Sequence, residues 1–295
     1  MEKGGLTPRG GTVRTAQSRN SALRSAAELA QERLLSVKGD PFLFADWERV
    51  VFLHFIVAPE LLRPFVPRPF ELELYEGEAC ISLVHVTMRR FRPCRPVSLG
   101  WLFRPITQQR FLNLRTYVHS GSEPGALFLW GWLSQPLPLR LPSAILGLPY
   151  SFASLDYEHD AELSVLHGAV SARNATESFA YRAAIAPHPP LAPCSPGSLA
   201  EFAMERYSGF FCRGPEPRVF RAWHPPWLQT PIDATIEDTS LVRNEFPWFK
   251  EAKLAGANFA PGFPKVWLGR PHRLHESGCL ASGRRRVLSA FYEMP

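Results

Sequence analysis

The sequence predicts a mainly β protein of the α+β class, in which antiparallel strands close into a barrel and a few helices pack outside it. The 295-residue chain has 29 prolines, and its apolar segments are short and interrupted by proline and other turn residues. Such interruption is typical of strands and turns rather than of a helical bundle. The segments are linked by turns and not by helical crossovers, which favours antiparallel pairing. No period of about 20 to 50 residues repeats, so solenoids and propellers are disfavoured.

The two ends of the chain are predicted to be basic tails that flank a single domain of residues 20–275. Residues 1–19 are rich in Gly, Arg and Thr, a composition typical of disorder. Residues 276–295 form the second tail. A helix is expected to begin at Asn20, because apolar residues recur at helical spacing as far as Val37, and to end near Gly39.

The domain itself is predicted to consist of short strands and two short helices. Pro59 suits the first turn of a helix over Glu60–Arg63, and Ser198 followed by Glu201 has the spacing that caps a helix extending to about Arg206. The strands on either side of the turn 120–125 are expected to pair as a hairpin. Strand-like runs occupy residues 50–57, 80–88, 111–119, 126–133, 151–157, 163–171, 178–185, 207–212, 218–224, 232–238 and 263–268.

The distribution of charge and the spacing of the cysteines argue against several classes of protein. Residues 1–24 carry a net +4 and residues 270–295 a net +3, so the chain between them sums to −1 of the total +6. The basic pI of about 9.2 is therefore no argument for a nucleic-acid-binding domain. The five cysteines form no C-x-x-C pair, which favours reduced thiols in the cytoplasm. No apolar stretch is long enough to cross a bilayer, and nucleotide-binding and hydrolase motifs are absent.

The segment FLNLRTYVH carries the strongest candidate for a binding residue. Its residues alternate, so Asn113, Arg115 and Tyr117 share one face of a strand while leucine and valine share the other. If the polar face points into a barrel, the Arg115 guanidinium needs an anion, because an unpaired buried charge costs several kcal/mol. A ligand carboxylate would satisfy it. An internal salt bridge to Glu205 or Glu201 explains the arginine equally well.

Four segments together resemble a known family. They are VAPELLRPFVPRPFE at residues 57–71, LNLRTYV at 112–118, GLPYSFA at 147–153 and LAEFAMERY at 199–207. They resemble the YqjF-like proteins, over about residues 30–275, and more distantly the acetoacetate decarboxylases. The decarboxylase resemblance depends on the first segment and on the Gly-x-Pro turn. It implies a cone-shaped antiparallel β-barrel of the acetoacetate decarboxylase-like type with a central apolar cavity.

The same resemblance argues against decarboxylase chemistry in this chain. In acetoacetate decarboxylase a lysine directly follows the proline of this turn and forms a Schiff base with the keto acid, and a second lysine beside it lowers its pKa. Here Tyr150 and Ser151 stand at the matching positions, and Ser143 and Ala144 replace the Arg-Glu pair that precedes the turn. A phenol or a hydroxyl cannot form an iminium, so Schiff-base decarboxylation is not expected.

Other candidate residues lie elsewhere in the predicted barrel. Tyr150 could donate a hydrogen bond to a ligand carbonyl or act as a general acid, or it could simply cover the core. His54 and His85 lie inside apolar strands and could form an acid/base pair, although satisfied core histidines are the simpler interpretation. The aromatic segment Trp223–Trp227 (WHPPW) is interpreted as a staple for a loop, with the rim of a cavity as the alternative.

The sequence thus predicts a barrel that binds a small organic carboxylate or carbonyl compound. The alternative is a non-catalytic binding or interaction protein that retains the barrel without chemistry. No cofactor or metal is expected, neither a membrane nor a nucleic acid is the expected partner, and a homo-oligomer is left open. A nucleic-acid or membrane-surface role for the basic tails and the arginines of residues 89–110 is the weakest hypothesis. Arg115, Asn113, Tyr117 and Ser151 are the expected ligand-binding residues, and Tyr150, His54 and His85 would be the catalytic groups of a lyase or hydratase.

Overall fold

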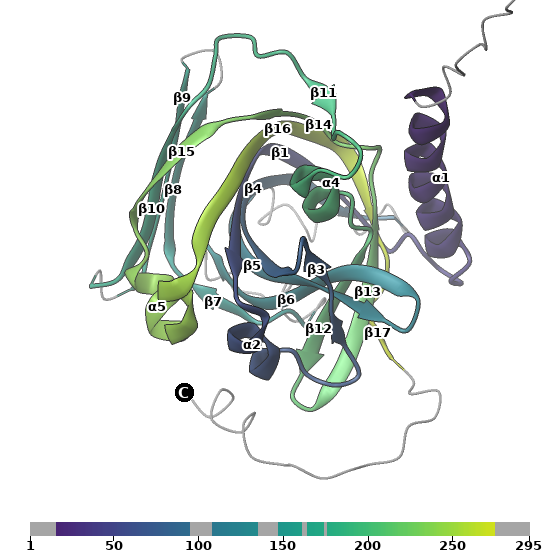
Figure 1. Cartoon of the computed structure of the whole chain (residues 1–295). Coiled ribbons are helices and arrows are strands. Elements are labelled where there is room, and N and C mark those ends of the chain that lie inside the picture. Colours follow the sequence, from purple (N-terminus) through teal and green to yellow (C-terminus); the bar gives the residue numbers. More distant parts are fainter. Residues whose placement is uncertain (1–15, 95–107, 135–146, 161–163, 174–175, 275–295) are drawn as a thin grey trace, which may run out of the picture.

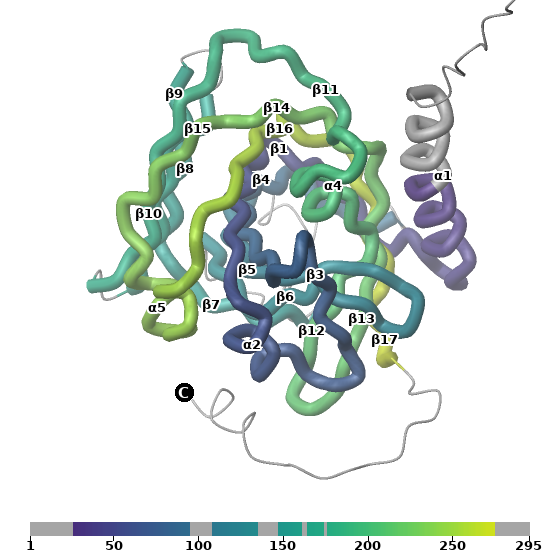
Figure 2. The backbone as a smooth tube through the Cα atoms, viewed as in Figure 1, coloured from purple at the N-terminus to yellow at the C-terminus, as the bar shows by residue number. Residues whose placement is uncertain are grey.

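The computed structural model describes residues 16–94, 108–134, 147–160, 164–173 and 176–274. The predicted tails fall outside this part of the chain, except for the start of the first helix. Most strands belong to two sheets. In Figures 1 and 2 the larger sheet encircles a central space, and the smaller sheet stands against its outer side.

Seven strands of the larger sheet pair in a closed ring. They are β1 (Leu43–Val57), β4 (Glu78–Pro93), β5 (Gln108–Ser120), β6 (Glu123–Leu133), β12 (Ser208–Arg213), β13 (Glu216–Trp223) and β16 (Lys253–Leu268). Each strand pairs with the next in this order, and β13 and β1 both pair with β16, which closes the ring. All of these pairings are antiparallel except that between β6 and β12. The prediction of a mainly β fold with strands closed on themselves is confirmed.

Strand β1 extends to Leu43, well beyond the predicted run of residues 50–57. Its register with β16 shifts between Ala45 and Trp47, and its register with β4 shifts between Glu48 and Val51. Such bulges bend a strand and increase its twist. They allow one long strand to follow the curvature of the ring, a feature that the apolar run alone does not reveal.

The smaller sheet contains β8 (Ser154–Asp160), β9 (Val165–Ser171), β10 (Ser178–Ala184) and β15 (Asp233–Asp238), in the order β15-β10-β9-β8. All its pairings are antiparallel. The predicted meander therefore exists, but it forms a separate sheet to which β15 is added. Burial alternates along β8, where Leu155, Tyr157 and His159 are buried. This sheet consequently packs with one face only.

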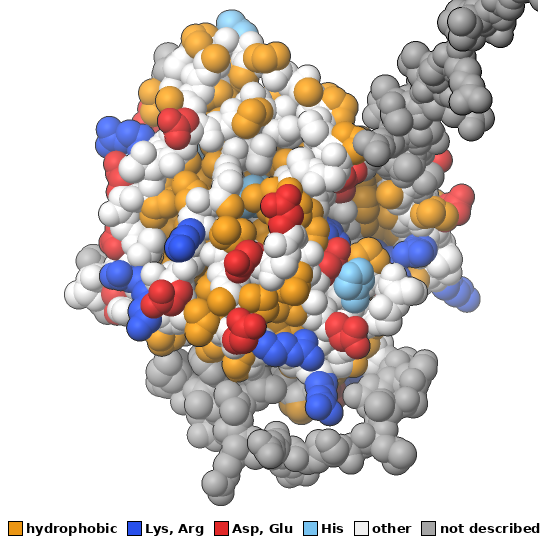
Figure 3. Space-filling model, in the orientation of Figure 1, with side chains coloured by type: hydrophobic (Ala, Val, Ile, Leu, Met, Phe, Trp, Pro, Cys, Tyr) orange, Lys and Arg blue, Asp and Glu red, His pale blue; other side chains and the backbone are white. Residues whose placement is uncertain are grey.

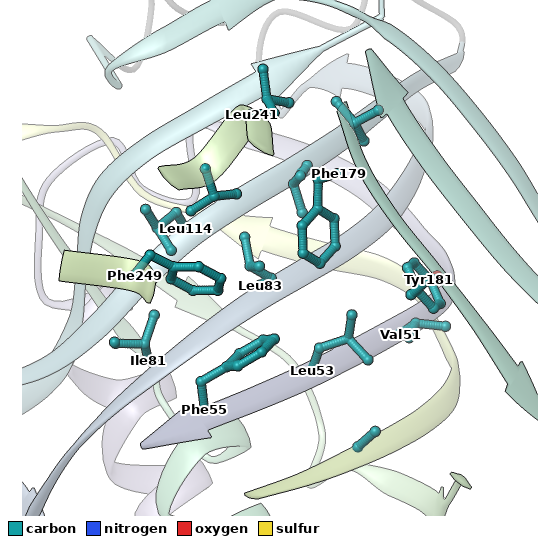
Figure 4. Packing of buried hydrophobic residues seen from close by; sticks show 14 of the residues in the cluster. Val51, Leu53, Phe55, Ile81, Leu83, Leu114, Phe179, Tyr181, Leu241 and Phe249 are labelled. Atoms are coloured by element: carbon teal, nitrogen blue, oxygen red, sulfur yellow. The ribbon is translucent and has the colours of Figure 1, made fainter. Parts of the chain in front are cut away.

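The main hydrophobic core fills the space between the two sheets. Figure 4 shows Leu53 of β1 and Leu83 of β4 packed with Phe179 and Tyr181 of β10. All four side chains are fully buried. Burying a side chain of this size stabilises the fold by roughly 1.5–3 kcal/mol relative to exposure, so this layer fixes the outer face of β1 and β4. Their alternate residues must then point into the ring.

Short helices surround the ring. They are α1 (Ala16–Leu35), α2 (Pro59–Leu62), α4 (Leu199–Met204) and α5 (Ser240–Glu245), with the 3-10 helices η1 (Arg63–Phe65) and η3 (Pro247–Glu251). Helix α1 begins earlier than predicted and lies against β13. Helix α4 lies over one end of the ring (Figure 1), and the hydroxyl of its N-cap residue Ser198 accepts from the backbone N–H of Glu201, as the sequence predicted. This helix ends at Met204 rather than at Arg206.

The remaining strands are short additions to the larger sheet. They are β2 (Glu71–Leu72), β3 (Leu74–Tyr75), β7 (Tyr150–Phe152), β11 (Ala192–Pro193), β14 (Leu228–Pro231) and β17 (His272–Arg273). The most important of them is β7, which pairs in parallel with β6 and so fixes Tyr150 beside Gly131. Within the described residues, no helix has the length and apolar character needed to span a membrane.

Candidate functional site

The interior of the ring contains a cavity with a free volume of about 80 Å³. Its wall is mainly apolar and includes Trp47, Phe52, Val84, Phe111 and Phe128. These side chains come from the inward-facing positions of β1, β4, β5 and β6, which alternate with the positions that pack elsewhere. The polar side chains on the wall are Asn113, Arg115, Tyr150, Arg206, Tyr207 and Ser208.

Arg115 lines this cavity, because it lies on the same face of β5 as Phe111 and Asn113. Its Nη2 donates a hydrogen bond of 2.9 Å to the carbonyl oxygen of Ala203 in α4. Its guanidinium carbon lies 5.5 Å from the ring centroid of Phe52, and its buried Nε has no hydrogen-bond partner. None of the ion pairs among the described residues includes Arg115.

The two acids considered as internal partners of Arg115 are engaged elsewhere. Glu205 accepts hydrogen bonds from the Tyr207 hydroxyl at 2.8 Å and from the Trp227 backbone N–H at 2.9 Å. Burial raises the pKa of Glu205 above its ordinary value. Glu201 accepts from the backbone N–H of Gly197 at 2.5 Å. The internal salt bridge that would have explained Arg115 is therefore not formed.

Tyr150 and Asn113 form a hydrogen-bonded pair on the cavity wall. The Tyr150 hydroxyl donates to Asn113 Oδ1 at 2.5 Å, and burial raises the pKa of Tyr150, so the phenol remains protonated. The ring lies directly over Gly131 of β6, where a Cβ atom would come within 2.0 Å of the ring carbon Cε1. Gly131 thus makes room for the tyrosine that the Gly-x-Pro turn presents to the cavity.

Three polar residues of the wall were not predicted as site residues from the sequence, although two of them lie in the LAEFAMERY segment and the third directly follows it. Arg206 forms hydrogen bonds of 2.7 and 3.1 Å to the carboxylate of Glu73. The Ser208 hydroxyl donates to Glu123 at 2.5 Å. The third residue, Tyr207, donates to Glu205. The resemblance pointed to this segment, but Glu73 and Glu123, the acid partners of Arg206 and Ser208, are too distant along the chain to be recognised from the sequence.

Tyr117 and His54 lie beside Arg115 but do not line the cavity. The Ser82 hydroxyl joins them, at 2.5 Å from the Tyr117 hydroxyl and 2.7 Å from His54 Nδ1. Burial lowers the pKa of His54 to about 3, so its imidazole is neutral. The guanidinium carbons of Arg115 and Arg206 lie 5.7 and 5.3 Å from the Tyr117 ring centroid. The hydrogen-bonded residues Tyr117, Ser82 and His54 therefore pack beside Arg115 and help to hold its side chain in position.

Two of the expected site residues lie away from the cavity. His85 points from the opposite face of β4 into the layer between the sheets, where it contacts Tyr157 and Tyr181. Burial lowers its pKa well below the ordinary value, and neither ring nitrogen has a partner. Because His54 and His85 lie on opposite sides of the ring wall, they do not face each other as an acid/base pair. Ser151 does not line the cavity either.

The aromatic segment WHPPW contacts helix α1 through Trp223 and the cavity through Trp227. Trp223 Nε1 donates to the carbonyl oxygen of Ala27 at 3.0 Å, which attaches α1 to the ring. Trp227 lines the cavity, and its ring stacks on that of Trp47 with centroids 6.1 Å apart. Proline stiffens the connection between these two contacts.

The basic segment of residues 89–110 has acidic partners in the described part of the chain. Arg90 and Arg92 both contact the buried carboxylate of Asp46, and Arg89 pairs with Glu48 at 3.1 Å. Figure 3 shows basic side chains interspersed with acidic ones on the face that it presents. The arginines at positions 95 and 104 lie outside the described residues. Among the described residues, no group of three or more His, Cys, Asp or Glu side chains is placed to hold a metal ion.

Comparison with known proteins identifies relatives of this chain and of its fold. The chain is 28% identical over 217 residues to the uncharacterised protein YqjF of Bacillus subtilis (strain 168), which covers 73% of this chain and 86% of that protein. The enduracididine biosynthesis enzyme MppR complexed with pyruvate has a similar fold, with a TM-score of 0.56 and 16% identity, over 82% of this chain and 94% of that one.

Acetoacetate decarboxylase from Legionella pneumophila gives a TM-score of 0.57 at 12% identity, over 79% of this chain and 87% of that one. At these identities the two solved structures establish a shared acetoacetate decarboxylase-like fold. The family model of DUF2071, described as an uncharacterised conserved protein, matches residues 45–262. By this match over most of its length, the chain belongs to the DUF2071 family.

Proposed function

We propose that this protein binds a small organic carboxylate in the cavity of the ring, with Arg115 as the anchor. The observation that carries the proposal is a guanidinium on an apolar cavity wall that has one hydrogen bond to a carbonyl oxygen and no acidic partner among the described residues. An arginine has five N–H donors, and a carboxylate would accept two of them in parallel.

The geometry favours binding over acid/base catalysis. Tyr150, the best placed acid, already donates its proton to Asn113, and His54 is separated from the cavity wall. No lysine is among the residues that line the cavity, so no amine is available there for a Schiff base. We therefore propose a binding protein that has kept the fold of the decarboxylases without their covalent chemistry.

The comparisons support a small organic ligand in this fold. MppR has been crystallised with pyruvate, a carboxylate of the size that a cavity of about 80 Å³ suits. None of the described cysteines forms a disulfide, which supports the cytoplasmic location expected of reduced thiols.

The test is calorimetric titration of short-chain carboxylates into the wild type and the Arg115→Gln variant. We expect the variant to lose at least about tenfold in affinity, because removing one partner of a buried charge pair costs about 2–5 kcal/mol. Arg182→Gln is the matched control, since Arg182 lies on the exposed face of the smaller sheet, where its ion pair among the described residues is with Glu237. If both variants bind carboxylates as the wild type does, Arg115 is not the anchor.

A further inference from the structure

We infer that the ligand is a short monocarboxylate whose remaining part is hydrocarbon, without a keto group or a second acid. This inference rests on the proposed function, because it assumes that the carboxylate binds at Arg115. The inference concerns the part of the ligand beyond its carboxylate, which would lie against the cavity wall away from Arg115.

The polar donors of the cavity wall are nearly all committed to partners within the protein. The hydroxyl protons of Tyr150, Tyr207 and Ser208 are donated to Asn113, Glu205 and Glu123, and Arg206 is held by Glu73 and by the carbonyl oxygen of Phe202. The groups left for a ligand are the Arg115 guanidinium and the amide nitrogen of Asn113 on the same strand face. Both suit a single carboxylate.

Beyond these two groups the wall is apolar. Trp47 and Trp227 also line the cavity. Their indole nitrogens have no hydrogen-bond partner, but these atoms are buried with almost no accessible surface, so the two residues present their rings to a ligand. A keto oxygen placed among Val84, Phe111 and Phe128 would lose its hydrogen bonds to water and find no donor, which is unfavourable. Among the described residues of the wall, a second carboxylate would find no free cation, since Glu73 neutralises Arg206.

The free volume limits the length of the hydrocarbon part. An apolar cavity of about 150 Å³ holds benzene, and the cavity here is smaller, at about 80 Å³. We therefore expect an occupant no larger than benzene, with at most about six non-hydrogen atoms, such as propanoate or butanoate.

The experiment compares ligands that share one skeleton. Butanoate, 2-oxobutanoate, butanamide and succinate are titrated into the full chain by calorimetry, with Arg115→Gln as the second protein. We expect butanoate to bind at least about tenfold more tightly than 2-oxobutanoate, because the extra oxygen is buried without a donor. Succinate and the neutral amide are expected to bind more weakly than butanoate as well, and Arg115→Gln is expected to weaken butanoate.

The outcomes separate this inference from the proposed function. If 2-oxobutanoate or succinate binds as tightly as butanoate or more tightly, and Arg115→Gln abolishes that binding, the hydrocarbon inference is wrong while the carboxylate site stands. If butanamide equals butanoate, or if none of the acids binds, the proposed function fails and the inference fails with it. Tighter binding of octanoate than of butanoate would overturn the size limit.

Discussion

Individual buried polar groups in this protein differ in how completely they are satisfied. Asp46, with 2% of its side chain exposed, accepts hydrogen bonds from Arg90, Arg92 and the backbone N–H of Lys265. These contacts hold the pKa of Asp46 below its ordinary value, against the opposing effect of burial. Among the described residues, Arg115 has no acidic partner of this kind, although it is a charged group inside the ring. This contrast between the two buried charges is the reason why we propose Arg115 as the ligand anchor.

His85 allows the cost of one buried polar side chain without a hydrogen-bond partner to be tested. It is fully buried and neither ring nitrogen has a hydrogen-bond partner, so we expect His85→Phe to raise the free energy of unfolding by about 1 kcal/mol. The wild type should also lose stability as the pH falls below about 6.5. The reason is that the depressed pKa keeps His85 neutral in the folded state, while the unfolded chain takes up the proton. The His85→Phe variant should lose less stability than the wild type over the same pH range.

Chemical denaturation of both proteins between pH 7.5 and pH 4 measures these effects. His159→Phe is the matched control, because His159 lies in the same cluster, donates from Nδ1 to the carbonyl oxygen of Arg49 and accepts from the Tyr181 hydroxyl. That variant should be less stable than the wild type. Equal destabilisation by the two substitutions would mean that the His85 ring has a polar partner after all.

At the scale of secondary structure elements, glycines in the strands make room for aromatic rings. Gly131 of β6 lies under Tyr150, and Gly168 of β9 lies under Tyr181, with Cβ positions 2.0 and 2.3 Å from the nearest ring carbon. Glycine within a strand often marks such a close approach. The Tyr150 ring lines the cavity, and the Tyr181 ring lies in the core between the two sheets. The two glycines therefore make room for an aromatic ring on each side of the ring wall.

The variant Gly131→Ala tests this arrangement. Its methyl group would displace the Tyr150 ring and break the hydrogen bond to Asn113, so we expect a loss of about 1–3 kcal/mol in the free energy of unfolding and weaker carboxylate binding. Gly256→Ala in β16 is the control, because its nearest contact would be an ordinary 3.7 Å from Leu199. In a Tyr150→Ala background the cost of Gly131→Ala should largely disappear. Two independent, additive costs would contradict the proposed clash.

At the scale of the whole molecule, the ring wall separates two different environments. The outer faces of β1 and β4 pack on the smaller sheet through Leu53 and Leu83, and their inner faces contribute Phe52 and Val84 to the cavity. The decarboxylase-like fold thus persists at 12–16% identity to the compared structures. Its hydrophobic layers define the fold, and the residues on the cavity wall define the chemistry.

At the scale of the whole molecule, we predict that the protein forms no Schiff base with a keto acid. The chain is incubated with acetoacetate or pyruvate and sodium borohydride, and intact-mass and peptide mass spectrometry then search for a reduced adduct. We expect none on the cavity wall, because the described residues that line it include no lysine. An acetoacetate decarboxylase treated in parallel shows that trapping works. A stoichiometric adduct mapped to the ring interior would disprove the assignment.

The sequence by itself determined the features that depend on neighbours along the chain. Alternation in FLNLRTYVH placed Asn113 and Arg115 on one strand face, and the spacing of Ser198 and Glu201 located the start of α4. Tyr150 and Ser151 in place of lysines argued against an iminium. Each of these conclusions depends on covalent geometry or on the side chain's own chemistry, which the sequence contains completely.

Only the tertiary structure decided which face of each strand points inward. Alternation allows two orientations for every strand, and the packing of the smaller sheet on the outer wall selects one of them. That choice put Arg115 in the cavity and His85 in the core, and it separated His85 from His54. It also brought Glu73 to Arg206, across 133 residues of chain. Contacts at such separation depend on how distant elements pack, and no local periodicity encodes them.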